Sequence, residues 1–214
     1  YNNIGTLEDA YGINIRPLST FAQETYKNDN CEKFLPKEFD YNKYDNSDRK
    51  IISKIHKAIT IIQFKLEGNM IKSHPEYNLK ERLLLDKMNL EKGTVKIDGK
   101  EYEINDKNFP TINKENPYEL TDKEKEVMDR LTESFIHSET LNNHINFLFS
   151  KGEMYTVFNN NLLFHGCIPM NEDGTFKEVK FLGKKLKGKA YFDEINETVN
   201  KAYVTKSKEL IDIM

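Results

Sequence analysis

The sequence predicts an α+β fold in which long helices are combined with short strands. Two long stretches repeat apolar residues at the spacing of one helix face. Between them, apolar and polar residues alternate on both sides of Asp98-Gly99, a pair typical of the two-residue turn of a β-hairpin. After Gly152, short apolar runs separated by asparagines favour strands. Helices and strands therefore share this chain, with most of the strands in its last third.

Residues 1–44 contain four glycines and prolines among short apolar pieces, which predicts a connector packed on a neighbouring structure. Leu18, Phe21 and Ala22 within it favour one turn of helix. A long helix follows, with Ser47 as its expected N-cap and His74-Pro75 at its end. Its apolar face is made of Ile51, Ile52, Ile55, Ile59, Ile62 and Leu66.

The next segments predict a short helix, a hairpin and a second long helix. Leu83, Leu84 and Leu85 supply the apolar side of a helix over about 79–88, and the hairpin spans about 94–104. Thr121 and Glu124 have the spacing of a capping box, which places the start of the second long helix. We expect that helix to continue to about Gly152.

The last third predicts two strands, a turn and a helix. The strands cover about 154–158 and 162–164, and the asparagines between them tolerate a left-handed backbone. Asp173-Gly174 indicates another turn, and a helical pattern returns over about 189–204.

Composition excludes several classes of protein. The chain has 214 residues, 31% of them charged, and a net charge of only -3, which disfavours nucleic-acid binding. No apolar run is long enough for a membrane helix, so no membrane partner is expected. Cys31 and Cys167 lie far apart and form no metal or redox spacing, which fits a reducing, cytoplasmic setting.

His165 is the main candidate for a metal ligand. The run Leu162-Leu163-Phe164 predicts a buried strand that ends at His165-Gly166, where the backbone must turn or lie close to another group. An imidazole there can coordinate a metal, although a histidine at a strand end is more often a hydrogen-bonded structural residue. The other four histidines lack the spacing of a zinc pair on a helix and are interpreted as structural or solvated.

A basic segment and one arginine are candidates for binding an anion. The stretch 183–190 nearly matches a phosphate-binding loop, but Ala190 stands where the loop needs a hydroxyl, so a solvated basic turn is the favoured interpretation. Lys184 and Lys185 can still attract an anionic substrate. Arg16 can bind a phosphate through two hydrogen bonds or pair with a surface carboxylate.

Two blocks of sequence resemble a known family. The strand followed by His165-Gly166 is similar to the histidine motif of the calcineurin-like metallophosphoesterases. More closely, the block 161–174, together with Tyr1 to Leu18, resembles the class 3 fructose-1,6-bisphosphatase family of Firmicutes and related bacteria. The resemblance runs through the whole chain and is strongest in these two blocks.

The resemblance implies a phosphatase of gluconeogenesis that hydrolyses fructose 1,6-bisphosphate to fructose 6-phosphate and phosphate. It implies two Mn²⁺ ions that activate a water, with His165 as a ligand and Gly166 as the close-approach residue beside it. The family's other metal motifs, Asp-x-His, Gly-Asp-x-x-Asp-Arg, Gly-Asn-His-Asp and a last Gly-His, do not occur in these residues. We therefore expect an internal fragment, inactive on its own, whose remaining ligands lie outside it.

The resemblance also implies a domain organisation. Residues 153–214 would supply strands and a helix of the metallophosphoesterase β-sandwich core. Residues 45–152 would form a mostly helical insertion with the hairpin, and residues 1–44 a connector on the catalytic core. A homo-oligomer is compatible with this arrangement. The alternative from another class is a non-catalytic module for protein interaction or regulation, in which the helices of 45–152 dock on a partner chain.

Overall fold

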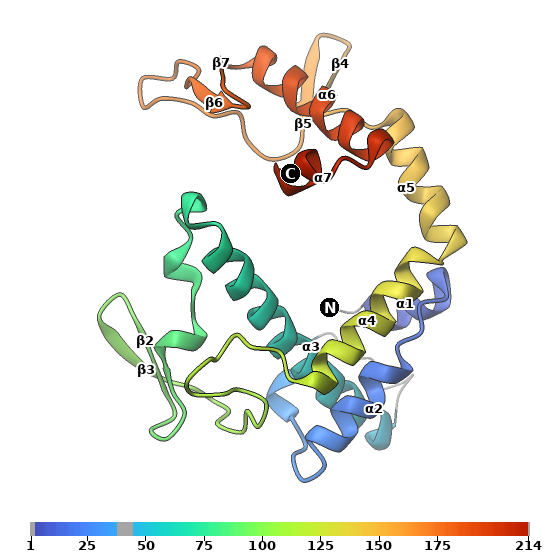
Figure 1. Cartoon of the computed structure of the whole chain (residues 1–214), viewed down its shortest axis with the longest axis vertical. Helices are drawn as coiled ribbons and strands as arrows, with labels where there is room; N and C mark the ends of the chain where they lie inside the picture. Colours follow the sequence, from blue (N-terminus) through green and yellow to red (C-terminus); the bar gives the residue numbers. More distant parts are fainter. Residues whose placement is uncertain (1–2, 38–44, 214) are drawn as a thin grey trace. The chain divides into compact units, whose positions relative to one another are not determined.

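A computed structural model describes residues 3–37 and 45–213, and these fall into two compact units, 1–140 and 141–214 (Figure 1). We refer to them as unit 1 and unit 2. The helices and strands combine into an α+β chain, as the sequence predicts. The helices are α1 Asn3–Tyr11, α2 Arg16–Thr25, α3 Asn46–Ser73, α4 Asp122–Ile136, α5 Glu139–Lys151, α6 Lys189–Thr205 and α7 Lys208–Ile213. The strands are β1 Met88–Asn89, β2 Thr94–Ile97, β3 Lys100–Glu103, β4 Tyr155–Phe158, β5 Asn161–Phe164, β6 Val179–Phe181 and β7 Lys184–Leu186.

The long helix α3 begins two residues before the position that the sequence predicts. Its N-cap is Asp45, whose carboxylate accepts hydrogen bonds from the backbone of Ser47 and Asp48. Asp48 in turn accepts from the Asp45 N–H, which completes a capping box. The prediction of Ser47 as the N-cap was wrong. Asp45, two residues earlier, accepts hydrogen bonds from backbone N–H groups of the first turn, which have no partner within the helix. The helix ends at His74, before Pro75, as expected.

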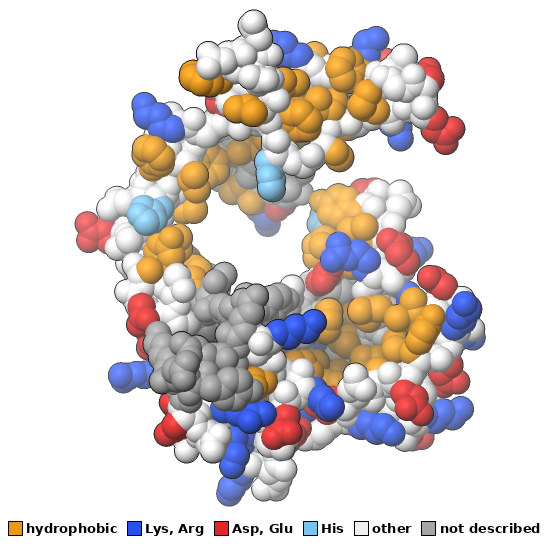
Figure 2. Space-filling view, turned by 180° about the vertical axis from the view of Figure 1, so that it is seen from behind, with side chains coloured by type: hydrophobic (Ala, Val, Ile, Leu, Met, Phe, Trp, Pro, Cys, Tyr) orange, Lys and Arg blue, Asp and Glu red, His pale blue; other side chains and the backbone are white. Residues whose placement is uncertain are grey.

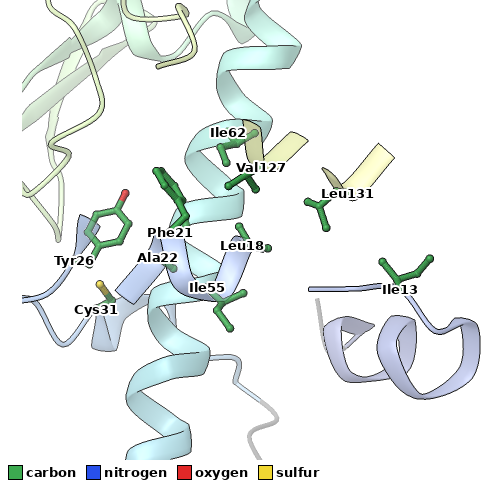
Figure 3. Packing of buried hydrophobic residues seen from close by; sticks show 11 residues of the cluster. Ile13, Leu18, Phe21, Ala22, Tyr26, Cys31, Ile55, Ile62, Val127 and Leu131 are labelled. Carbon is green, nitrogen blue, oxygen red and sulfur yellow. The ribbon is translucent and has the colours of Figure 1, made fainter. Parts of the chain in front are cut away.

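The core of unit 1 lies where α2 packs against α3 and α4. Figure 3 shows Leu18, Phe21 and Ala22 of α2 beside the buried isoleucines of α3. The predicted helical turn is therefore part of a complete helix, α2. The cluster contains Ile13, Leu18, Phe21, Ala22, Tyr26, Cys31, Ile55, Ala58, Ile62, Val127 and Leu131.

The predicted helix over 79–88 is not formed. This segment contains two short 3₁₀ turns, η3 Lys80–Arg82 and η4 Leu85–Lys87, separated by extended or irregular backbone. The phenol oxygen of Tyr118 accepts a hydrogen bond from the Asp86 N–H, which directs this backbone group out of a helical pattern. A contact from 32 residues away thus overrides the local preference. Two further 3₁₀ turns are η1 Glu32–Phe34 and η2 Pro75–Tyr77.

The predicted hairpin is confirmed as β2 and β3, which pair antiparallel from Thr94–Glu103 to Ile97–Lys100. Asp98 and Gly99 both have positive φ angles, 48° and 79°, as a primed two-residue turn requires. The short β1 adds a third strand beside β2, giving the order β1-β2-β3.

The second predicted long helix is two helices. Thr121 and Glu124 form the expected capping box at the start of α4, but α4 ends at Ile136 and α5 begins at Glu139. At the break, the buried Ser138 donates its hydroxyl hydrogen to the Tyr11 carbonyl, at 2.6 Å between the oxygens. This tertiary bond accompanies the interruption of the helix.

The boundary between the compact units lies between residues 140 and 141. The described part of the predicted connector, residues 3–37, belongs to unit 1 and packs on α3 and α4. The roles assigned to the ranges 1–44, 45–152 and 153–214 stay predictions. Among the described residues, no helix is both long and apolar enough to cross a membrane.

Candidate functional site

The candidate metal ligand follows the hairpin made by β4 and β5. The two strands pair antiparallel, with Phe158 opposite Asn161 and Tyr155 opposite Phe164. Asn159 and Asn160 form the turn with φ angles of 48° and 60°. Asparagine enters this left-handed region more readily than most residues, so the turn predicted from the asparagines is confirmed.

The open end of this hairpin is held against α6 by aromatic contacts. The ring centroids of Tyr155 and Phe164 each lie 6.1 Å from that of Phe192, which is buried. The Tyr155 hydroxyl donates to Asp193 Oδ1 at 2.9 Å, and Lys189 Nζ lies 2.6 Å from Asp193 Oδ2. These hydrogen bonds, first from Lys189 and then from Tyr155, lower the pKa of Asp193. α6 therefore fixes the end of β5 from which His165 follows.

The prediction that β5 is a buried strand was wrong for this chain. Leu162, Leu163 and Phe164 are 49%, 53% and 42% exposed, and on β4 Val157 and Phe158 are 62% and 67% exposed. Successive residues of a strand point to opposite faces, so the hairpin is apolar on both faces. No described residue covers either face sufficiently to bury these side chains.

His165 itself is exposed, and so is Cys167 two residues later. Gly166 between them has a φ of 91°, a backbone conformation that favours glycine. An added Cβ there would meet no described atom within 4 Å, so no described group lies close to this glycine. The described residues contain no group of three or more His, Cys, Asp or Glu side chains that could hold a metal ion. The role of His165 as a ligand stays a prediction.

Lys184 and Lys185 lie on β7, and both are paired with carboxylates. Lys184 Nζ lies 2.7 Å from each carboxylate oxygen of Glu194, and Lys185 Nζ lies 2.9 Å from Glu178 Oε1. The hydrogen bond with Glu178 raises the pKa of Lys185. The charge of each ammonium group is therefore largely balanced by a neighbouring carboxylate.

The segment resembling a phosphate loop is the β6–β7 hairpin leading into α6. Leu182 and Gly183 form its turn with positive φ angles, and Gly188 is the N-cap of α6. A Cβ on Gly188 would lie 2.9 Å from the Phe176 ring, so glycine is needed there for packing. This arrangement agrees with the basic turn that the sequence favours.

Arg16, at the start of α2, lines a polar cavity of about 490 Å³ between α2 and α4. Two ion pairs cross or border this cavity, Lys123–Glu24 at 3.0 Å and Arg130–Glu126 at 2.8 Å. Within the described residues, no carboxylate lies within ion-pair distance of the Arg16 guanidinium. Arg16 belongs to unit 1, whereas His165 and the two lysines belong to unit 2.

Sequence reasoning missed two lysines that are fully buried on α3, Lys57 and Lys65. The available signal was their position, because both are spaced at helical intervals from buried isoleucines. Lys57 Nζ lies 2.7 Å from both Asp29 and Asp106. It also lies within 6 Å of the rings of Tyr26, Phe34 and Phe109.

Asp29 shows the strength of this charged cluster. Burial alone would raise the pKa of its carboxyl, but hydrogen bonds from Lys57, the Cys31 N–H and Asn108 outweigh burial and lower the pKa to about 2. Burial raises the pKa of the neighbouring Cys31 thiol to about 12, so this cysteine is held as an inert thiol.

Comparison with known proteins gives a consistent result over the whole chain. The family model for "Firmicute fructose-1,6-bisphosphatase" matches residues 1–214. A class 3 fructose-1,6-bisphosphatase of Clostridium botulinum (strain Langeland) is 53% identical over 206 residues, which cover 96% of this chain and 31% of that protein. One from Clostridium acetobutylicum is 52% identical over 203 residues, 95% of this chain and 30% of that protein.

The chain thus spans about a third of the length of the curated relatives that it matches. No solved structure matches it. The family match extends across both compact units, including the block around His165 and the first eighteen residues in which the sequence resemblance is strongest. The chain belongs to the Firmicute fructose-1,6-bisphosphatase family.

Proposed function

We propose that this chain is part of a phosphatase that hydrolyses fructose 1,6-bisphosphate to fructose 6-phosphate and phosphate with the help of Mn²⁺. The observation that carries the proposal is 53% identity, over 96% of the chain, to a protein named fructose-1,6-bisphosphatase class 3. The same relation supports a role in carbohydrate metabolism and a place in the cytoplasm. The names of the relatives favour this function over a non-catalytic interaction module.

The described residues do not by themselves fit a centre of two Mn²⁺ ions. Two ions need several carboxylate and imidazole ligands, and His165 is the one ligand that the family resemblance assigns in this chain. Since no cluster of further ligands surrounds it among the described residues, the other ligands must come from elsewhere in the complete protein. We therefore assign His165 a ligand's role and derive no catalytic step from this chain.

The hairpin β4–β5 supports placing His165 inside a larger fold. A sheet with apolar side chains on both faces is typical of strands buried between two layers. Val157, Phe158, Leu162 and Leu163 have this character and are exposed here. This agrees with the proposal that residues 153–214 complete a metallophosphoesterase β-sandwich core with other parts of the protein.

Arg16 is the stronger of the two proposed contacts with substrate phosphate. Its guanidinium has no carboxylate partner among the described residues and faces a cavity of about 490 Å³. Guanidinium groups suit phosphate because they donate two parallel hydrogen bonds. Lys184 and Lys185 would first have to exchange Glu194 and Glu178 for the phosphate. A homo-oligomer remains part of the proposal.

The main test is His165→Ala in the complete protein, with bound manganese and turnover of fructose 1,6-bisphosphate as readouts. Even substitutions beside a metal ligand commonly cost about 10–100-fold in affinity or activity, so loss of the ligand should cost at least this much. The matched control is His137→Ala, another exposed histidine, whose ring nitrogen contacts its own helix at the Glu133 carbonyl.

The control should leave metal content and turnover unchanged. Full manganese content and wild-type turnover in His165→Ala would refute the ligand assignment. A complete protein that never hydrolyses the bisphosphate, with any divalent metal, would instead favour the interaction module of residues 45–152.

A further inference from the structure

The cavity between α2 and α4 gathers three cationic side chains of unit 1. Arg16 of α2 and Lys123 and Arg130 of α4 all line it, and its volume is about 490 Å³. Two carboxylates, Glu24 and Glu126, line the same cavity. Three cations against two anions leave the lining with one net positive charge. An excess of positive charge around a concave site attracts anions.

The carboxylates do not neutralise the three cations equally. Lys123 Nζ lies 3.0 Å from Glu24 Oε2, and Arg130 Nη2 lies 2.8 Å from Glu126 Oε1. Each glutamate therefore has a cation of its own. The Arg16 guanidinium has no carboxylate within ion-pair distance in the described part of the chain. The uncompensated positive charge of the cavity is thus at Arg16.

Hydrogen bonds hold the backbone that carries Arg16. The Arg16 N–H donates to Asn14 Oδ1 at 3.1 Å, and the Asn14 N–H donates to Ser134 Oγ of α4 at 2.8 Å. The second bond joins the start of α2 to α4 across 120 residues of sequence. A backbone fixed in this way reduces the conformational entropy that is lost when a ligand binds.

Part of the cavity wall is apolar and belongs to the core. Phe21 and Val127 line the cavity and are 6% and 4% exposed. Both are members of the buried cluster of unit 1, so this wall is closely packed. A volume of about 490 Å³ lies within the range of roughly 300–1,000 Å³ that is typical of small-molecule pockets. The cavity therefore has room for more than a bare inorganic anion.

We propose that this cavity binds a small molecule through its phosphate group, with Arg16 as the primary contact. A phosphate monoester carries nearly two negative charges at neutral pH, and a guanidinium donates two parallel hydrogen bonds to its oxygens. Lys123 and Arg130 supply further positive charge when the phosphate competes with their glutamates. The apolar wall packs against the carbon skeleton of the bound molecule.

Two sources of the phosphate share this chemistry, namely the substrate and a separate phosphorylated ligand. The assignment to the substrate rests on the proposed function. Fructose 1,6-bisphosphate carries two phosphate groups, and only one of them is hydrolysed, so the other is available for a binding contact. The binding of phosphate at Arg16 does not itself depend on hydrolysis.

Hydrogen exchange of the complete protein tests the site, with inorganic phosphate compared with chloride at the same ionic strength. Phosphate should slow exchange in peptides of α2 and α4. Arg16→Gln should weaken this binding about tenfold or more, because it removes hydrogen bonds from a charged group. Unchanged exchange in the parent, or equal protection in Arg16→Gln, would overturn the proposal.

Neutralising a carboxylate of the cavity should have the opposite effect. Glu24→Gln removes a negative charge and releases Lys123, so phosphate should bind roughly two- to fivefold more tightly, as expected for one nearby charge in water. The matched control is Glu91→Gln, which likewise releases an exposed lysine of unit 1, Lys114. We expect the control to leave phosphate binding unchanged. Weaker binding in Glu24→Gln, or an equal gain in both variants, would contradict the site.

Steady-state turnover of fructose 1,6-bisphosphate identifies the source of the phosphate. If the substrate occupies the cavity, Arg16→Gln should raise KM about tenfold and change kcat little, as expected for a contact that is equal in the ground and transition states. If a separate ligand occupies it, KM stays at the parent value while phosphate protection is still lost. Both results support the site. A protein that shows Arg16-dependent protection but hydrolyses no bisphosphate would retain this site and refute the proposed function.

Discussion

In unit 1, α2, α3 and α4 enclose a continuous apolar cluster in which Ile13, Ala22 and Ile62 have no exposed surface. In unit 2, Phe192 is 5% exposed, whereas Phe158 and Leu163 on the hairpin are 67% and 53% exposed. Figure 2 shows hydrophobic side chains, in orange, at the surface of this unit. Unit 1 buries a large set of apolar side chains among its own helices, although a few on α3 and α4, such as Met70 and Ile136, are exposed. Unit 2 has regular secondary structure but covers few of its apolar side chains.

This difference indicates where each unit obtains its stability. Apolar side chains stabilise a fold by roughly 25 cal/mol per Å² removed from water, so exposed ones contribute little. Large exposed apolar patches mark interaction surfaces in folded proteins. We therefore expect unit 1 to be stable on its own and unit 2 to gain stability from a surface that covers its apolar side chains.

The largest expected effect comes from removing one member of a buried ion pair in unit 1. Lys65→Met leaves Glu124 charged and unpaired in the interior, which typically costs about 3–5 kcal/mol. The double variant Lys65→Met/Glu124→Met should recover part of that loss. Urea unfolding, monitored by hydrogen exchange of α3 peptides, measures the stability of the single and the double variant. A single variant as stable as the parent would contradict the burial of this pair.

The second prediction compares the same kind of truncation in the two units. Ile62→Ala in the unit 1 core should cost about 2–5 kcal/mol, as expected for a fully buried side chain. Leu163→Ala on the exposed hairpin should change the stability of residues 1–214 by less than about 0.5 kcal/mol. In the complete protein, Leu163→Ala should become costly. Equal losses of stability from Ile62→Ala and Leu163→Ala in residues 1–214 would refute the difference between the two units.

The third prediction concerns the charged cluster at Lys57. The pKa of Asp29 is lowered to about 2 from its usual 3.8, so its stabilising contribution is fully present above about pH 4 and is lost as the pH falls through 2. A shift of this size corresponds to a contribution on the order of 2 kcal/mol. Asp29→Asn should therefore be less stable than the parent at pH 6.

The difference in stability between the parent and Asp29→Asn should disappear as the pH approaches 2. Urea midpoints of both proteins, determined between pH 6 and pH 2, measure this gap. Asp129→Asn, at an exposed carboxylate of α4, is the control and should show no such pH-dependent gap. A gap that stays constant down to pH 2 would rule out titration of Asp29 as its source.

The smallest effect is expected at an ion pair on the surface of unit 2. Lys184→Ala removes a contact with Glu194 from a lysine that is 59% exposed, and such pairs contribute about 0–1 kcal/mol. Its free energy of unfolding in urea should stay within about 0.5 kcal/mol of the parent's. A larger loss would show that β7 is held on α6 chiefly by this pair.

Elements whose signals are local could be predicted from the sequence. The turns at Asp98-Gly99 and Asn159-Asn160 depend on residues that enter left-handed backbone, and both appear as expected. The capping box of Thr121 and Glu124 is equally local and is confirmed. These signals need only a few neighbouring residues.

Elements shaped by distant contacts could not be predicted. The break between α4 and α5 coincides with a bond from Ser138 to Tyr11, 127 residues away. The segment 79–88 has helical composition, but Tyr118 binds the Asp86 backbone. The burial of Lys57 and Lys65 also depends on distant carboxylates. For the candidate site, the sequence predicts His165 as a ligand, and this role stays a prediction because the described residues around the exposed ring supply no further ligands.

The pairing of β4 with β5 has one more consequence. In a two-stranded sheet, each strand hydrogen-bonds on one side only, so its outer backbone N–H and C=O groups remain open for a further strand. Neither strand carries a proline or a charged residue, either of which would block such an addition. In isolation, this chain should self-associate edge to edge, with aggregation beginning at the hairpin.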